Sequence, residues 1–278
     1  MSPFDRMKFG FSTFFFTRKP IREVIDEMIS HNMRTIELSL EVPHMEGMNE
    51  DFVTRMAALR EDGIDLSIHA PFLEVNSGSN HKEIRRFSRK RTRMAVDMAH
   101  KIGCNPVVLH PGYTFWMDKV KEEMERARAY FMRDLKDTVS YARKRNVKIA
   151  LEQVPMPFFF FYDLPQFLDL LQAVPGLGMT LDIGHAYLTK RIKGIDDPEG
   201  AIIENLKEIG VEHVSHVHLH NNKGKRDDHL VLDGNIDIRR IMRFLDEEGY
   251  TGKVIVESHE MERLGIPVVL EKLKELLS

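Results

Sequence analysis

Short apolar segments alternate with longer amphipathic segments along the whole chain. The apolar segments have the length and composition of buried strands, and the longer ones repeat their apolar residues with helical spacing. We predict strands at residues 8–13, 34–39, 65–69, 106–110, 147–152, 178–182, 214–220 and 253–257. We predict helices at residues 21–30, 49–62, 81–102, 117–146, 163–173, 198–209, 238–248 and 266–277.

The strict alternation of the two element types favours a parallel sheet. Eight strand–helix units within 278 residues predict an α/β fold, a (β/α)8 TIM barrel that forms a single domain over residues 1–278. A doubly wound open sheet is the main alternative. The first strand is not followed by a glycine-rich phosphate loop, which weakens a nucleotide-binding version of that alternative.

Composition narrows the class of protein. With 42% hydrophobic and 30% charged residues, the chain has the profile of an ordinary soluble globular protein. Its formal net charge of -3 gives no overall attraction to a polyanion. The lone cysteine, Cys104, excludes an intrachain disulfide and suits a reducing compartment. We find neither a long apolar run nor a signal-peptide pattern, and therefore expect a cytoplasmic protein with no membrane partner.

Polar side chains gather where the predicted strands end. Five strands end on a residue that can bind a metal ion: His69, His110, Glu152, Asp182 and Glu257. Four more candidates lie in the seventh strand or in the loops: His218, His185, Asp227 and His229. In a barrel, the C-terminal strand ends converge on one mouth. So many carboxylates and imidazoles in one place would repel or stay unsatisfied without a cation. The mixture of ligand types suits Zn, Mn or Fe.

Alternate residues of the seventh strand form a row of histidines on one face: His216, His218 and His220. His218 is the best candidate for a shared metal, and His216, one step deeper, is expected to be structural. His220 lies at the rim, where it would contact substrate, or replace His218 if the register shifts by two. A single histidine such as His69 has a simple structural explanation, and Glu37 would be a barrel-interior carboxylate paired with a cation.

Several short motifs occur in a specific order. They are Ile68-His69-Ala70-Pro71, His110-Pro111-Gly112, Leu151-Glu152-Gln153, Leu181-Asp182-Ile183-Gly184-His185-Ala186, His218-Leu219-His220, Asp227-Asp228-His229 with Gly234-Asn235-Ile236-Asp237, and Val256-Glu257. In these motifs and their order, nearly the whole chain resembles the xylose-isomerase-like TIM barrels. That superfamily includes sugar phosphate isomerases and epimerases, and also abasic-site nucleases of the endonuclease IV type.

The resemblance implies one to three divalent metal ions. In the nuclease pattern, His69, His110 and Glu152 hold the first of three zinc ions. Glu152 also bridges to the second, whose other ligands are Asp182, His218 and Glu257. The remaining residues, His185, Asp227 and His229, hold the third. The isomerase pattern needs only Glu152, Asp182, His218 and Glu257 around one metal, with the two glutamates as acid and base.

The isomerase or epimerase hypothesis, which we favour, predicts a small-molecule sugar or sugar phosphate as substrate. Aromatic residues follow several strands and would pack on the faces of a sugar: Phe14, Phe15, Phe16, Phe72, Trp116 and Phe158 to Phe161. Of these, Phe15 and Trp116 are our candidate substrate contacts, together with His220, Lys223 and Arg226. The same aromatic rim would equally suit the interface of a homo-oligomer.

The nuclease hypothesis would make DNA the partner. Basic residues near the predicted mouth would then contact phosphates: Lys190, Arg191, Lys193, Lys223, Lys225 and Arg226. Three features count against the nuclease hypothesis. They are the acidic net charge, the short link from His218 to Asp227, and Gln153 at the position where those nucleases typically carry Asn. A metal-dependent barrel that binds a ligand without catalysis is a third possibility.

Overall fold

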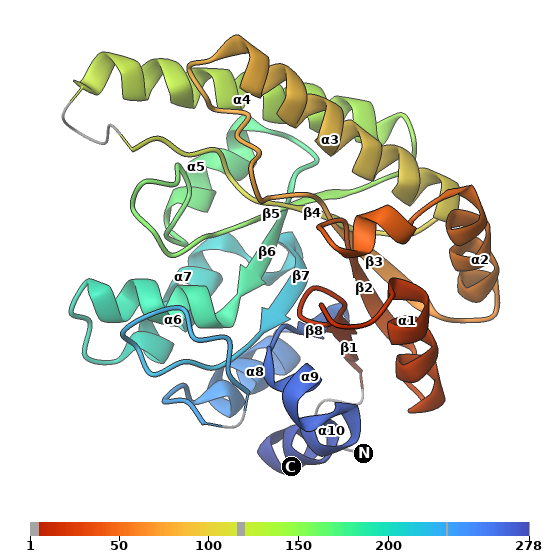
Figure 1. Ribbon diagram of the computed structural model, residues 1–278. Coiled ribbons are helices and arrows are strands. Elements are labelled where there is room, and N and C mark those ends of the chain that lie inside the picture. Colours follow the sequence, from red (N-terminus) through yellow and green to blue (C-terminus); the bar gives the residue numbers. More distant parts are fainter. Residues whose placement is uncertain (1–5, 116–119, 232, 278) are drawn as a thin grey trace.

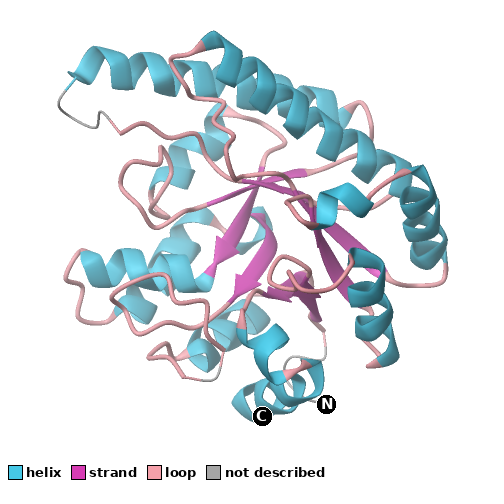
Figure 2. Cartoon of the chain, in the orientation of Figure 1, coloured by secondary structure: helices cyan, strands magenta, loops and turns pink. Residues whose placement is uncertain are grey.

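The computed structural model describes residues 6–115, 120–231 and 233–277 of the chain. Parallel strands close into a barrel in the order of the sequence, and helices surround it (Figures 1 and 2). The strands are β1 (Lys8–Ser12), β2 (Thr35–Ser39), β3 (Asp65–His69), β4 (Val107–Leu109), β5 (Ile149–Glu152), β6 (Gly178–Asp182), β7 (Val214–Leu219) and β8 (Lys253–Val256). The predicted (β/α)8 barrel is therefore confirmed, and all C-terminal strand ends share one mouth.

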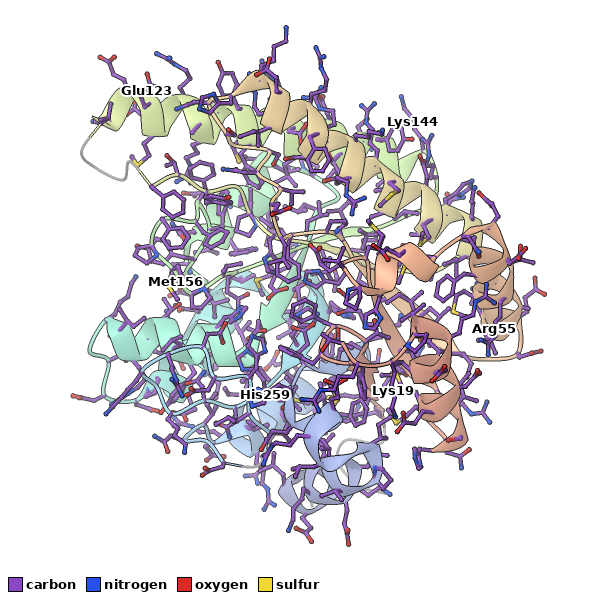
Figure 3. All side chains as sticks on the ribbon, in the orientation of Figure 1. Lys19, Arg55, Glu123, Lys144, Met156 and His259 are labelled. Atoms are coloured by element: carbon purple, nitrogen blue, oxygen red, sulfur yellow. The ribbon has the colours of Figure 1, made fainter. Side chains whose placement is uncertain are left out.

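Most of the helices lie where the amphipathic segments predict them. They are α1 (Ile21–Ser30), α2 (Glu50–Glu61), α3 (Lys82–Ile102), α4 (Lys121–Arg143), α5 (Gln166–Ala173), α6 (Ile183–Ile192), α7 (Pro198–Ile209), α8 (Ile238–Glu247), α9 (Glu260–Leu264) and α10 (Ile266–Leu277), with the 3-10 turns η1 (His44–Gly47) and η3 (Val211–His213). The predicted start of the fourth helix, at 117–119, lies outside the described residues. Charged side chains such as Lys144 project outward from this layer (Figure 3).

The sequence did not lead us to expect α6, and this corrects the prediction that His185 lies in a loop. Asp182, the last residue of β6, is also the N-cap of α6, because its Oδ1 accepts the backbone N–H of His185 at 2.7 Å. An aspartate in this role satisfies a backbone donor that would otherwise be free in the first turn. The helix therefore begins directly after the strand, and it places His185 in its first turn.

The barrel has an apolar outside and a polar inside. Outward-facing side chains such as Phe11, Ile36 and Ile68 are fully buried between the strands and the helices. Facing inward are polar side chains that are also fully buried: Ser12, Glu37, Ser67, Thr180, His216 and His218. The register puts Ser12 beside Glu37 and Glu37 beside Ser67 on three neighbouring strands. Below the mouth, the centre of the barrel is thus lined with polar groups.

Candidate metal and substrate site

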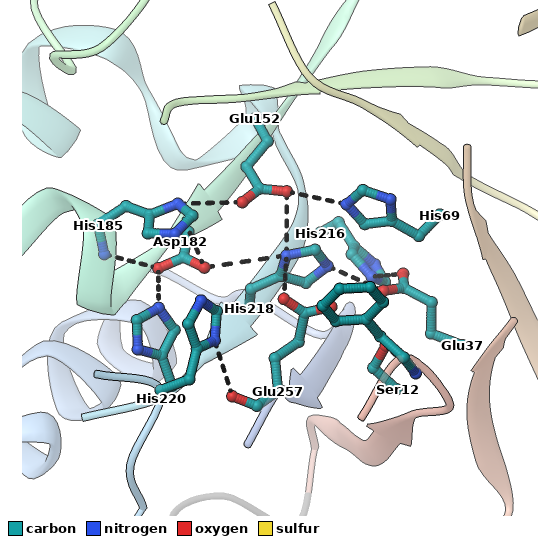
Figure 4. Close-up of polar contacts among 12 residues, drawn as sticks. Ser12, Glu37, His69, Glu152, Asp182, His185, His216, His218, His220 and Glu257 are labelled. Atoms are coloured by element: carbon teal, nitrogen blue, oxygen red, sulfur yellow. Dashed lines mark hydrogen bonds and ion pairs between the residues drawn. The ribbon is translucent and has the colours of Figure 1, made fainter. Parts of the chain in front are cut away.

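Glu152 lies at the centre of the barrel mouth. It ends β5, is only 1% exposed, and has imidazoles around both carboxylate oxygens (Figure 4). The Oε2 atom lies 3.1 Å from Nδ1 of His218, 3.4 Å from Nε2 of His69 and 3.5 Å from Nε2 of His110. The Oε1 atom lies 3.1 Å from Nδ1 of His185. The structure thus brings together five predicted ligands that are far apart in the sequence.

Three carboxylates converge on one nitrogen of His218. Besides Glu152, the Oε2 atom of Glu257 lies 3.6 Å from Nδ1 of His218, and Oδ2 of Asp182 lies 4.0 Å from it. Asp182, His218 and Glu257 each offer a ligand atom within 4.8 Å of the others. Oε2 of Glu152, Oδ2 of Asp182 and Nδ1 of His218 are buried without a hydrogen-bond partner. Buried groups of this kind need a compensating charge.

A second group lies beside the first, around Asp227. Its Oδ2 atom is 3.1 Å from Nε2 of His185 and 3.2 Å from Nε2 of His229. His220 joins this group rather than the rim: it is fully buried, with Nε2 3.0 Å from Oδ1 of Asp182 and 3.7 Å from Oδ1 of Asp227. The rings of His220 and His229 stack with centroids 3.9 Å apart. This group has four members, and each offers a possible ligand atom within 4.8 Å of those of the other three: His185, His220, Asp227 and His229.

The charges in the mouth are strongly interdependent. Burial alone would raise the pKa of Glu152, but the surrounding imidazoles hold it well below its ordinary value. Burial alone would lower the pKa of His69, yet the contact with Glu152 raises it to about 9. In the same way, nearby carboxylates raise the pKa values of His185 and His218 well above the ordinary value. Imidazole protons and a bound cation are therefore alternative ways to neutralise these carboxylates, and metal binding would release protons.

A cavity of about 380 Å³ opens next to these residues and has two contrasting walls. The polar wall consists of His69, His110, Glu152, His185, Asp227, His229 and Glu257. The aromatic wall consists of Phe14, Phe72, Tyr113, Phe115, Phe158 and Phe159. A mainly apolar cleft with a few convergent polar groups is the usual form of a small-molecule site.

A family model described as "Xylose isomerase-like TIM barrel" matches residues 25–276. The chain belongs to this family. The uncharacterised protein MJ1311 of Methanocaldococcus jannaschii is 28% identical over 259 residues, which are 91% of this chain and 84% of that protein.

Solved structures agree with this membership. A D-tagatose 3-epimerase-like protein is 28% identical and superposes with a TM-score of 0.79, covering 98% of this chain and 97% of that one. The IolI protein, crystallised with a zinc atom, has a TM-score of 0.78 at 19% identity, covering 97% of this chain and 96% of that one. The second comparison shows a shared fold.

Several predicted substrate contacts of this xylose isomerase-like barrel lie away from the cavity. Lys223 pairs with Asp233 at 2.8 Å and Arg226 with Asp228 at 2.6 Å, and neither cation lines the cavity. The ring of Phe15 lies 5.1 Å from that of His229, just outside the described lining. Trp116 lies outside the described residues.

Other aromatic and basic residues near the mouth have structural positions. Phe16, Phe160 and Phe161 are buried in the core. Lys190 is also buried, where it pairs with Asp163 at 2.8 Å. These four side chains therefore stabilise the barrel wall rather than reach into the cavity.

Two asparagines hold the loop that carries Asp227 and His229. Asn221 exchanges backbone hydrogen bonds with Leu230, and its side-chain oxygen accepts the N–H of Ile236 at 2.9 Å. Asn222 donates from its side chain to the carbonyl of Gly184 at 2.8 Å, which ties this loop to α6. Both asparagines follow the predicted end of the seventh strand at residue 220, and the alternation of polar and apolar residues does not predict that they are buried.

Proposed function

We propose that the chain is a divalent-metal-dependent sugar isomerase or epimerase. The observation that carries this proposal is the convergence of three buried carboxylates, Glu152, Asp182 and Glu257, on Nδ1 of His218 beside an aromatic-walled cavity. The likeness to a D-tagatose 3-epimerase-like protein, at 28% identity over almost the whole chain, supports it.

Glu152, Asp182, His218 and Glu257 would hold the metal ion. The buried, unpartnered atoms of Glu152, Asp182 and His218 fit a cation. The mixture of nitrogen and oxygen in the four residues suits Zn, Mn or Fe. The zinc in the IolI structure is consistent with that choice. When bound, the metal would supply electrophilic polarisation of a sugar carbonyl. Two further ligand sets are available for additional ions. The first consists of His69 and His110 with Glu152, and the second consists of His185, Asp227 and His229.

The two glutamates would move the proton. Glu152 and Glu257 approach His218 from opposite sides of the mouth (Figure 4). One carboxylate removes a proton from the carbon beside the carbonyl, and the other returns a proton from the opposite face of the sugar. Although burial alone would raise the pKa of Glu152, the imidazoles around it hold this pKa well below its ordinary value, so the carboxylate is ionised. The aromatic wall would pack on the sugar and exclude water.

The cavity favours an unphosphorylated sugar. Among the described residues that line it, none is a lysine or an arginine, whereas four are carboxylates: Glu74, Glu152, Asp227 and Glu257. A phosphate dianion would face these carboxylates without a lysine or an arginine to bind it. Lys223 and Arg226 are already paired with aspartates on their own loop.

One observation favours the alternative, a zinc-dependent nuclease acting at abasic sites in DNA. The group around Asp227 offers enough ligands for an additional ion, and clustered metals are typical of phosphodiester hydrolysis. The acidic surroundings of the cavity and the net charge of -3 make it the weaker candidate.

Elemental analysis and two assays separate the candidates. The first assay measures hydrogen exchange at carbon, in deuterated water, for a panel of ketoses and their phosphates. The second measures nicking of a duplex that contains an abasic site. Metal-dependent exchange without nicking is the expected result. Two or three zinc ions per chain, with nicking and no exchange, would overturn the proposal in favour of the nuclease. Binding of sugar without exchange or nicking would instead indicate a non-catalytic barrel.

A further inference from the structure

Glu37 is a carboxylate in the middle of the barrel, outside the cavity described above. It lies on β2, across the barrel from β7, and is fully buried. An ionised carboxylate in such a place is costly unless other groups neutralise it and satisfy its oxygens. Its position within a strand, rather than at a strand end, is the reason that the sequence pattern did not include it in the site.

Both oxygens of Glu37 lie close to imidazoles of β7 (Figure 4). Oε2 lies 2.8 Å from Nε2 of His216 and accepts the hydroxyl of Ser67 at 3.1 Å. Oε1 lies 3.1 Å from Nε2 of His218, which is an ion-pair distance, although the two atoms do not form an aligned hydrogen bond. Burial alone would raise the pKa of Glu37, but the charges of His218 and His216 hold it well below its ordinary value. The carboxylate is thus fixed by three partners on β3 and β7.

The contact with His218 determines which way that ring presents its lone pair. A carboxylate has only acceptor oxygens, so its negative charge 3.1 Å away favours the tautomer of His218 that carries the proton on Nε2. In a neutral imidazole, the other nitrogen then has the lone pair. That nitrogen, Nδ1, is the atom on which Glu152, Asp182 and Glu257 converge. A lone pair that faces three carboxylates is favourable only with a cation between them.

We propose that Glu37 is a positioning residue for the metal centre, through His218. It holds the ring in one orientation and one tautomer, with Nδ1 free to bind the metal. His216 and Ser67 in turn hold Glu37, which keeps the carboxylate from turning away from His218. The inference rests on the proposed function, because it assumes that His218 is a metal ligand. Carboxylates that lie behind a metal-binding histidine typically strengthen metal binding by ten- to a hundredfold.

The test compares Glu37→Gln with Glu41→Gln. Glutamine keeps the shape of Glu37 but loses its charge and cannot accept from both imidazoles. Glu41 is also a buried glutamate that follows β2, but its side chain accepts the backbone N–H groups of Phe72 and Leu73. The zinc affinity of each purified protein is measured by competition with a chromophoric chelator, and the visible spectrum of the cobalt-loaded protein reports the geometry of the ligands.

We expect Glu37→Gln to weaken zinc binding by about ten- to a hundredfold and to change the cobalt spectrum. The Glu41→Gln control should bind zinc within about threefold of the wild type, because it leaves the partner of His218 in place. Circular dichroism checks that each variant is folded. If Glu37→Gln does not fold, Glu37→Asp decides by the same criteria, since it keeps the charge but withdraws the carboxylate from His218.

The outcomes are distinguishable. Unchanged zinc affinity and an unchanged cobalt spectrum in a folded Glu37 variant would overturn the positioning role and leave the proposed function intact. Equal weakening in Glu37→Gln and Glu41→Gln would also overturn it, because the effect would then reflect general loosening of the barrel. A wild-type chain that binds no divalent metal would overturn the proposed function, and this inference with it.

Discussion

The two walls of the cavity are built in different ways. The residues of the polar wall come mainly from strand ends or directly after them, and most, such as Glu152 and Glu257, are buried. The aromatic wall comes from the loops after β1, β3, β4 and β5, and its rings are only partly buried, with Phe115 as much as 72% exposed. Side chains on a rigid scaffold hold accurate geometry, whereas loop residues adapt. We therefore assign the chemistry to the polar wall and the fit of the substrate to the aromatic wall.

The largest effect should come from Glu152→Gln. This change removes the charge that balances His69, His110 and His218, and it removes a proposed proton-transfer group. We expect metal content to fall and the rate of hydrogen exchange on the substrate to drop by about 10²- to 10⁴-fold. Elemental analysis and the exchange assay measure the two effects on the same preparation.

Glu199→Gln is a matched control for this change. Glu199 is also a buried glutamate, but it accepts the backbone N–H of Asp237 at 2.9 Å and does not line the cavity. It should keep both metal content and activity near the wild-type level. Full activity in a folded Glu152→Gln variant would contradict the whole assignment of the polar wall.

Removal of the metal should have the next largest effect, and it should act on stability. A ligand that binds only the folded state at a hundred times its Kd stabilises that state by about 2.7 kcal/mol. For a chain of this size, this corresponds to a fall in Tm of about 5–10 °C when a chelator is added. Calorimetry with and without chelator, followed by re-addition of zinc or manganese, measures the shift. An identical Tm under all three conditions would show that these carboxylates are neutralised by protonated imidazoles alone.

Much of the polar wall could be predicted from the sequence, for a simple geometric reason. Each of its strand-end members follows a short apolar segment, and parallel strands in a barrel all end at the same mouth. The position of a residue such as Glu152 or Glu257 relative to its strand is therefore enough to place it. The same reasoning placed Glu37 in the barrel interior but did not predict its contact with His218, because that contact crosses the barrel and the order of the sequence does not show which interior side chains meet.

The aromatic wall and its surroundings were predicted less well, since loops set their geometry. Phe14 and Phe72 line the cavity as expected, but Tyr113 and Phe115 had no pattern that pointed to them. The start of α6 was missed because Gly184 disfavours a helix, whereas the cap by Asp182 starts one. Ion pairs within a single loop, such as the one between Lys223 and Asp233, also cannot be deduced from alternation of polar and apolar residues.

A smaller effect should follow from Phe115→Ala, which tests whether the aromatic wall acts on binding alone. The exposed ring contributes little to folding, so the variant should unfold within about 0.5 kcal/mol of the wild type. Loss of an aromatic contact with the substrate, worth about 0.5–1.5 kcal/mol, should raise KM by about two- to tenfold with little change in kcat or metal content. Phe87→Ala is the control, because Phe87 is half-exposed on α3 and does not line the cavity. A fall in kcat with unchanged KM would contradict the assignment of substrate binding to the aromatic wall and chemistry to the polar wall.

The smallest effect should come from Lys223→Gln and Arg226→Gln, and it is the most informative about the substrate. Both side chains are exposed and paired on their own loop, and such surface pairs contribute little to stability because water and salt screen their charges. With an unphosphorylated ketose, we expect each variant to keep kcat/KM within about twofold of the wild type. The decisive measurement repeats the assay with the corresponding ketose phosphate. A wild type that prefers the phosphate by tenfold or more, and variants that lose this preference, would show that the loop turns inward to bind phosphate. Lys223 and Arg226 would then belong to the polar wall, and the proposal of an unphosphorylated substrate would be wrong.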